Sequence, residues 1–436
     1  MRVRIKAWKD YSEEDKLNLF RRSESDISEV EEGVRGIISE VKRQGDRALR
    51  EFSQQFDHVD LSDRRIAVQS AEFDEAERKL DKKTKESLDY AIDKIYCFHL
   101  TQKPQGIHFT PLGHGLMAGE KASPIDSVGL YVPRGRGSFP SMLYMLAVPA
   151  RVAEVPLIQV VTPPNPDGSV DPACLYCARR LGVDSVYRVG GAQAIAALAY
   201  GTESIRRAVK VVGPGSRYVA AAKRLLSSVI DTGLPAGPSE SMIVADDTAE
   251  PWDLALDLMV EAEHGSDSCA VLLTDSRHLA QEVAEAVEEL LREVPEPRLS
   301  FLHDVLQRYG GIIFTEDIQE AVQIVNQFGP EHLQLRTSEP FSLMEEIHNA
   351  GEILLGPHLP FSAANYLTGV NAVLPTGGWA KTYSPVSVRD FIKYSSVVYA
   401  ERQAYDDFAE HTRRIAEYEG FHTHAAAIRR RGERSR

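Results

Sequence analysis

The sequence contains little cysteine and no long apolar run. Cysteine occurs 4 times in 436 residues, which is too few for a disulfide scaffold in a chain of this length. No apolar stretch approaches the roughly 20 residues that a membrane-spanning helix requires. The first residues run into charged sequence without the apolar core of a signal peptide. We therefore expect a cytoplasmic protein.

Basic residues are fewer than acidic residues. The chain carries 64 acidic against 50 basic residues, which gives a formal net charge of −14. A surface of this sign repels nucleic acids and anionic membranes. Small molecules or other proteins are therefore the expected partners.

The dinucleotide fingerprint G-x-G-x-x-G is absent from the sequence. Two other glycine-rich junctions, Gly190-Gly191 and Gly213-Pro214-Gly215, each separate a predicted strand from a predicted helix. Each junction alone is typical of a tight turn, but its backbone N–H groups also suit a pyrophosphate. Two such junctions in one sheet favour a nucleotide crevice at the strand ends.

The pair Cys174 and Cys177 forms a C-x-x-C motif without a second pair elsewhere. A redox or metal site normally needs additional ligands or a different context. We interpret the pair as packing within a helix, with redox or metal chemistry as the alternative.

Hydrophobic patterning predicts alternating strands and helices in two blocks, which is typical of α/β folds with parallel sheets. The first block has strands at 127–132, 157–162, 185–189 and 209–212, with helices at 139–153, 171–182 and 192–200. The second has strands at 241–245, 269–274 and 311–315, with helices at 250–263, 277–293 and 317–328. Charged helical segments are predicted at 12–53, 70–103 and 401–418.

The segment Glu261-Ala262-Glu263-His264 closes the helix predicted at 250–263. Residues three apart share a helix face, so Glu261 and His264 could bind one metal ion. Glu261 also continues the apolar row of Leu254 and Leu258, where a carboxylate needs a partner. The alternative is a solvated acidic helix end.

The segment Gly329-Pro330-Glu331-His332 places a carboxylate beside an imidazole, just after a predicted helix. In a loop, both side chains could address one substrate, with the histidine transferring protons and the carboxylate orienting water. A surface pair in a helix-terminal turn is the alternative.

Together these segments resemble the histidinol dehydrogenase family over nearly the whole chain. The most specific matches are Val128–Pro133, Tyr187–Gly201, Val212–Gly215, Ala236–Glu240, Ala262–Gly265, Pro330–Leu333, Val373–Gly377 and Glu419–Ala425. The resemblance implies an NAD-dependent alcohol and aldehyde dehydrogenase that contains zinc or a similar divalent metal. It also implies a homodimer whose active site is completed by the partner's C-terminus.

The implied fold is α/β, with two incomplete Rossmann-like parallel-sheet domains and helical N- and C-terminal extensions. We expect an N-terminal extension over residues 1–25 and a discontinuous first domain over 26–130 and 239–386. The NAD-binding domain would span 131–238. Residues 387–436 would form a helical extension that is exchanged between the subunits of the dimer.

The resemblance also assigns roles to individual residues. Glu331 and His332 would be the catalytic acid–base pair, with His332 taking the alcohol proton and Glu331 activating water. The residues implied to contact NAD are Tyr131, Gln193 and Ser216, the last standing where the family usually has asparagine. The implied substrate-binding residues are Ser239, His332, Ala372 and Glu419. The implied metal ligands are Glu261, His264, Asn365 and His424, with Glu419 and His424 acting across the dimer.

Two of these ligands depart from the family pattern together. Glu261 stands where the family has glutamine, and Asn365 stands where it has aspartate. The pair still supplies one carboxylate and one amide, so a divalent ion could be retained. Independent drift after loss of the metal is the alternative.

Ala372 stands where the family has a histidine, and nothing nearby in the sequence replaces that imidazole. A lost pocket hydrogen bond typically weakens binding by about 1–3 kcal/mol. The sequence therefore favours a polar alcohol other than histidinol as substrate. Genuine histidinol dehydrogenase and a catalytically silent nucleotide-binding paralogue are the alternatives.

Overall fold

The computed structural model of the chain describes residues 3–21, 28–134, 137–183 and 185–434. Their contacts define two compact units: residues 1–102 with 126–391, and residues 103–125 with 392–436. Within the described ranges, no helix is both long enough and apolar enough to span a bilayer.

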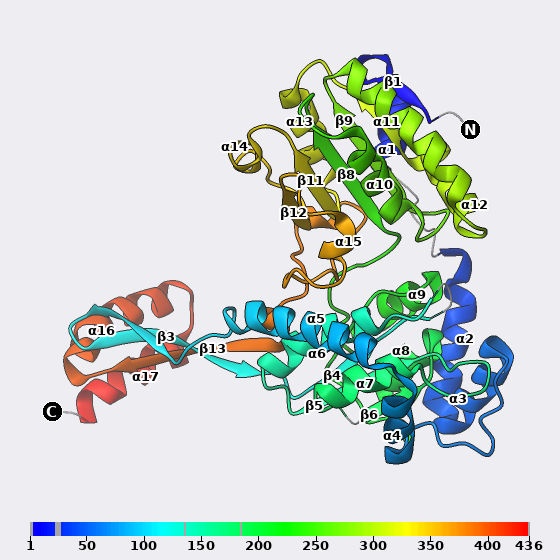
Figure 1. Cartoon of the computed structure of the whole chain (residues 1–436). Coiled ribbons are helices and arrows are strands. Elements are labelled where there is room, and N and C mark those ends of the chain that lie inside the picture. Colours follow the sequence, from blue (N-terminus) through cyan, green and yellow to red (C-terminus); the bar gives the residue numbers. More distant parts are fainter. Residues whose placement is uncertain (1–2, 22–27, 135–136, 184, 435–436) are drawn as a thin grey trace. The chain divides into compact units, whose positions relative to one another are not determined.

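A six-stranded parallel sheet forms one half of the first unit (Figure 1). Its order is β1-β10-β9-β8-β11-β12, with β1 (Ile5–Ala7), β10 (Gly311–Phe314), β9 (Cys269–Thr274), β8 (Glu240–Ala245), β11 (His332–Arg336) and β12 (Glu352–Leu355). Both faces are apolar, as a parallel sheet covered on both sides requires. In β8, Met242 and Val244 pack on one side, and Ile243 and Ala245 pack on the other.

Helices cover both faces of this sheet. One face carries α1 (Glu13–Arg21), α13 (Ile318–Phe328) and α14 (Pro340–Met344), and the other carries α10 (Pro251–Ala262), α11 (Arg277–Leu290), α12 (Arg298–Asp304) and α15 (Phe361–Ala364).

A four-stranded parallel sheet forms the other half of this unit, in the order β6-β5-β4-β7. Its strands are β6 (Ser185–Arg188), β5 (Leu157–Thr162), β4 (Ser127–Tyr131) and β7 (Lys210–Val212). One helix group, α2 (Ser28–Gln44), α3 (Asp46–Phe52), α8 (Gly191–Tyr200) and α9 (Arg217–Leu226), packs against one face. The second group is α4 (Ser70–Lys79), α5 (Lys82–Leu100), α6 (Pro140–Val152) and α7 (Pro172–Arg180). The predicted α/β fold with two parallel sheets is therefore confirmed.

The predicted domain boundaries stay a prediction, because residues 28–102 and 239–386 belong to the same compact unit. The apolar face of α2, which includes Val34 and Val41, packs on α8 and α9 of the four-stranded sheet. Helix α5 packs on α6, and β4 pairs with β5 and β7. The predicted boundary between residues 25 and 26 lies outside the described residues.

Both terminal extensions contain a strand that the helical prediction missed. Near the N-terminus, β1 pairs in parallel with β10 and so becomes the edge of the six-stranded sheet. In the C-terminal segment, β13 (Ile392–Ala400) pairs antiparallel with β3 (Leu116–Pro124), which also pairs with β2 (His108–Gly113). Helices α16 (Arg402–Tyr418) and α17 (His422–Arg434) pack on each other in the same unit.

Gly213, in the turn between β7 and α9, occupies a position where the backbone conformation and the neighbouring atoms both oppose a side chain. Its φ is +124°, and an added Cβ would lie 2.1 Å from the carbonyl oxygen of Tyr131. We expect Gly213→Ala to lower the free energy of unfolding by about 2–4 kcal/mol, because both the backbone angle and the close contact oppose it. Urea unfolding followed by circular dichroism would measure the change.

Gly36→Ala is the matched control for Gly213→Ala. Gly36 lies within α2, and a Cβ added there meets nothing within 4 Å. This variant should gain about 0.5–1 kcal/mol from the higher helix propensity of alanine. Equal stability of the two variants would contradict the strained turn at Gly213.

Candidate active site

A cavity of about 390 Å³ lies in the first unit and contains most of the expected site residues. It is lined by seven of them: Ser239, Glu261, His264, Glu331, His332, Asn365 and Ala372. The loop that carries Ala372 is fixed by the buried Asn371, whose side chain accepts from the Val373 N–H at 2.9 Å and donates to the Met145 carbonyl at 2.6 Å. The cavity therefore collects side chains from segments far apart in the sequence.

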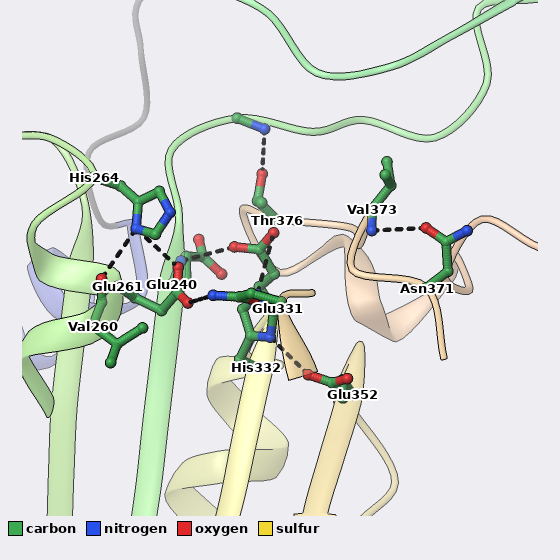
Figure 2. A network of polar contacts seen from close by, with 12 residues as sticks. Glu240, Val260, Glu261, His264, Glu331, His332, Glu352, Asn371, Val373 and Thr376 are labelled. Carbon is green, nitrogen blue, oxygen red and sulfur yellow. Dashed lines mark hydrogen bonds and ion pairs between the residues drawn. The ribbon is translucent and has the colours of Figure 1, made fainter. Parts of the chain in front are cut away.

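The C-terminal end of α10 supplies Glu261 and leads to His264. Leu254, Leu258 and Glu261 are all buried, so the carboxylate continues the apolar row as expected. The helix ends at Ala262, and His264 turns back so that its Nδ1 lies 3.1 Å from the Val260 carbonyl and 3.4 Å from Glu261 Oε2 (Figure 2). The predicted pairing of this carboxylate and imidazole is present in the structure.

Asn365 follows α15 and reaches Glu261 across a separation of 104 residues. Its Nδ2 donates to Glu261 Oε1 at 2.6 Å, and the side chain of Ser239 also hydrogen-bonds to this carboxylate. Burial alone would raise the pKa of Glu261. The charges of His332 and His264, together with these hydrogen bonds, outweigh burial and hold that pKa below its ordinary value. Glu261 is therefore a buried, ionised carboxylate.

Glu331 lies in a bend directly before β11, as expected of a loop residue, whereas the expected loop placement of His332 was wrong. His332 is the first residue of the strand and pairs with Ser241 of β8 and Glu352 of β12. Glu331 Oε2 accepts the Glu240 N–H at 2.9 Å, and Glu331 Oε1 lies 3.9 Å from His332 Nε2. Sheet pairing on both sides holds His332 more rigidly than a loop would, and the hydrogen bond from the Glu240 N–H holds Glu331.

Three buried carboxylates act on His332, from Glu261, Glu331 and Glu352, and a fourth, that of Glu240, acts on Glu331. Burial alone would lower the pKa of His332, but the charge of Glu261, the hydrogen bond to Glu352 and the charge of Glu331 raise it. Burial also raises the pKa of Glu331, assisted by the charges of Glu261 and Glu240. Such a concentration of negative charge favours a cationic ligand.

The donor set at the end of α10 fits a divalent metal ion. Glu261 and His264 provide oxygen and nitrogen, and Asn365 could add its amide oxygen, which are ligands that zinc accepts. The contact of His264 Nδ1 with a backbone carbonyl leaves Nε2 as the coordinating atom, an arrangement common among metal-bound histidines. Among the described residues, no group of three or more His, Cys, Asp or Glu side chains is arranged to hold a metal. The amide is therefore essential to a three-ligand set from this unit.

The residues expected to contact NAD lie at the carboxyl ends of the four-stranded sheet, outside the cavity lining. Tyr131 ends β4, and its hydroxyl accepts the Gly191 N–H at 3.1 Å, where α8 begins. Gln193 is buried in the first turn of α8, and Ser216 is the N-cap of α9. Two helix N-termini thus meet at one sheet edge, as a nucleotide crevice requires.

Three polar residues near the site gave no recognisable signal in the sequence. Lys223 of α9 donates to the Gly213 carbonyl at 2.6 Å, and burial lowers the pKa of this lysine to about 8. Arg298 lines the cavity and donates to the Glu263 carbonyl at 2.7 Å. Glu352 contacts His332 only because β11 and β12 are paired. The contacts of Arg298 and Glu352 join different elements, and Lys223 bonds to the turn before its own helix.

Glu419 and His424 belong to the second unit, so their contribution to the cavity stays a prediction.

The C-x-x-C motif lies within a helix, as predicted. Cys174 and Cys177 are buried in α7, where burial raises the pKa of both thiols well above the ordinary value. Unreactive thiols in a packed helix support the structural interpretation.

Comparisons with known proteins identify the family of this chain. Residues 20–432 match the family model described as Histidinol dehydrogenase. A "Histidinol dehydrogenase homolog" from Rhizobium meliloti (strain 1021) is 50% identical over 95% of this chain and 91% of its own length. "Histidinol dehydrogenase" from Synechocystis sp. is 48% identical over 95% of each chain.

A solved structure extends the comparison to three dimensions. The crystal structure of histidinol dehydrogenase from Elizabethkingia anophelis superimposes with a TM-score of 0.93 at 32% identity, covering 99% of this chain and 98% of that one. The chain therefore belongs to the histidinol dehydrogenase family of NAD-dependent oxidoreductases.

Proposed function

We propose that this protein oxidises L-histidinol to the amino acid through an aldehyde, in two NAD-dependent steps. The observation that carries the proposal is the buried pair Glu331 and His332, which lines the same cavity as Ser239 and the group at the end of α10. The acidic surroundings of His332 suit an amino alcohol, whose ammonium group is positive.

The comparisons do not support the different substrate that Ala372 suggested. Relatives that are 48% and 44% identical to this chain carry the name histidinol dehydrogenase. Ala372 does line the cavity, so the wall lacks an imidazole at that position. We infer that other groups in the cavity compensate for this change.

In the first step, His332 acts as the base. Its Nε2 takes the proton from the alcohol hydroxyl while hydride passes from the carbinol carbon to NAD. The products are the aldehyde, one NADH and a protonated His332. The neighbouring carboxylates that raise the pKa of His332 stabilise the imidazolium formed in this step. The positive charges of the substrate ammonium and of a bound divalent ion would lower that pKa again, so that the ring enters the step neutral.

In the second step, Glu331 activates water against the aldehyde. Its Oε2 is held by the Glu240 N–H, which leaves Oε1 on the side of His332. Burial raises the pKa of Glu331, which makes its carboxylate a better proton acceptor. Hydride transfer from the hydrated aldehyde to a second NAD then gives the carboxylate.

Glu261, His264 and Asn365 would hold the divalent metal, with Ser239 beside them. When bound, the ion supplies Lewis-acid polarisation of the substrate's polar groups. Tyr131, the Gly190–Gly191 turn and Ser216 would position NAD at the sheet edge. In the same proposal, Glu419 and His424 of a second copy would complete the cavity in a homodimer.

The test is an NADH-formation assay on L-histidinol beside a panel of other amino alcohols, diols and anionic alcohols. We expect two NADH per L-histidinol and a larger kcat/KM for L-histidinol than for any other compound. Two NADH per molecule would distinguish oxidation to the acid from an enzyme that stops at the aldehyde.

Two results would contradict the proposal in different ways. Turnover of another alcohol but not of L-histidinol would show that the chemistry is right and the substrate wrong. Absence of NADH with every compound, together with NAD binding, would show a silent nucleotide-binding paralogue.

A further inference from the structure

Glu352 is a buried carboxylate that no role described above requires. It begins β12, directly beside His332 of β11 in the parallel register (Figure 2). Its Oε2 lies 2.8 Å from His332 Nδ1, and the exposed fractions of the two residues are 8% and 3%. Aligned residues in neighbouring parallel strands present their side chains on the same face, so sheet pairing itself enforces the contact.

The burial of Glu352 makes a purely structural role a poor explanation. Its second oxygen, Oε1, has no hydrogen-bond partner among the residues that the structure describes. A buried carboxylate with one good partner costs desolvation energy that an apolar side chain at the edge of a core would avoid. The hydrogen bond to His332 is the interaction that accounts for its presence.

We propose that Glu352 is a positioning residue for the reaction, which holds His332 by its Nδ1–H and so directs a basic Nε2 toward the substrate. This inference rests on the proposed function. The neutral imidazole carries a proton on one nitrogen, and the partner of Nδ1 decides which one. With Nδ1 donating to Glu352, the lone pair lies on Nε2, the atom 3.9 Å from Glu331 Oε1.

The surroundings of the ring fix its orientation as well. The Phe361 ring packs edge-on against His332, with centroids 5.9 Å apart and an angle of 71° between the planes. In the proton transfer, the alcohol O–H bond breaks and a new N–H bond forms at Nε2, while Nδ1–H stays bonded to Glu352. The carboxylate of Glu352 then faces a full imidazolium charge, which it stabilises.

Two variants separate the charge of Glu352 from its hydrogen bond. Glu352→Gln keeps an acceptor for Nδ1–H without the charge, and Glu352→Leu removes both. Residues that orient a functional histidine through a hydrogen bond typically contribute 10–100-fold to activity. We therefore expect kcat to fall about 10-fold in Glu352→Gln and about 100-fold in Glu352→Leu. KM should change little, because Glu352 is not part of the cavity lining.

Nitrogen-15 NMR of His332 provides a readout that needs no substrate. Above about pH 10, the value to which the surrounding carboxylates raise the pKa of His332, the ring is neutral. We expect that neutral ring to carry its proton on Nδ1 in the wild type and in Glu352→Gln, and to lose that preference in Glu352→Leu. The other charged groups that act on the ring, Glu261 of α10 and Glu331, are unchanged in both variants, as is Glu240 beside Glu331.

Asp257→Asn is the matched control. Asp257 is another buried carboxylate beside the same sheet, but it bonds to Gln334, Arg336 and the backbone N–H of Phe361, makes no contact with His332 and does not line the cavity. This variant should lower stability without changing the His332 tautomer. If Glu352→Leu behaves in the same way, with reduced stability and an unchanged tautomer, the role of Glu352 is structural and the proposal is overturned.

This experiment distinguishes failure of the proposed function from failure of the positioning role of Glu352. If the wild type oxidises no alcohol, the proposed function fails, while the NMR result still decides whether Glu352 sets the tautomer. If the wild type is active and Glu352→Leu retains its kcat, the positioning role fails and the proposed function stands.

Discussion

His332→Gln is expected to lower kcat for alcohol oxidation by about 10³-fold, because the variant lacks the base that takes the hydroxyl proton. Glutamine is similar in size and polar, but its amide cannot accept a proton near neutral pH. The NAD site is built from other elements, around Tyr131 and the N-termini of α8 and α9. The NAD dissociation constant, measured by calorimetry, should therefore stay within about twofold of the wild-type value.

His278→Gln makes the same chemical change on the exposed surface of α11 and should leave kcat unaltered. A reduction of similar size in both variants would indicate general damage to the protein. A wild-type kcat in His332→Gln would remove His332 from the mechanism. The aldehyde, supplied directly as substrate, offers a further check. Its oxidation also depends on Glu331, so His332→Gln should change the rate of aldehyde oxidation by a different factor from the rate of alcohol oxidation.

Glu261→Gln and Asn365→Asp, which restore the residues expected for the family, should have strongly non-additive effects on zinc binding. Glu261→Gln removes the carboxylate from the set, and we expect zinc affinity to fall about 100-fold with a matching loss of kcat. Adding Asn365→Asp should restore both, because the double variant again has one carboxylate and one amide. Zinc content after gel filtration, measured by mass spectrometry, would test this without reference to activity.

The single variant Asn365→Asp completes the cycle. Asn365 Nδ2 lies 2.6 Å from Glu261 Oε1, so aspartate there would set two carboxylates face to face. Without metal this variant should unfold at a lower temperature than the wild type, and added zinc should recover the loss. If the effects of the two substitutions on zinc binding simply add, the positions do not share one ion.

Local sequence patterns predicted much of this protein. Alternation of β-rich and helical runs placed most of the strands and helices of both parallel sheets, because side-chain periodicity is set within a few residues. The spacing of Glu261 and His264 predicted their convergence at the end of α10. The adjacent carboxylate and imidazole of Glu331 and His332 predict an acid–base pair, and the two side chains lie 3.9 Å apart.

Pairings between distant segments could not be predicted in this way. The attachment of α2 to α8 and α9, and of β1 to β10, depends on which apolar surfaces meet in three dimensions. Helical periodicity in α2 identifies a buried face but not its partner. The sequence therefore could not show that α2 packs on the helices of the four-stranded sheet.

The sequence by itself determined the family, the two-sheet α/β architecture and the chemical types gathered at the site. Only the tertiary structure decided that His332 lies in a strand, that Asn365 donates to Glu261, and that Glu352 bonds to His332. The physical reason is that strand register and loop closure are collective results of packing over the whole sheet. No local pattern encodes which carboxylate will lie beside which imidazole.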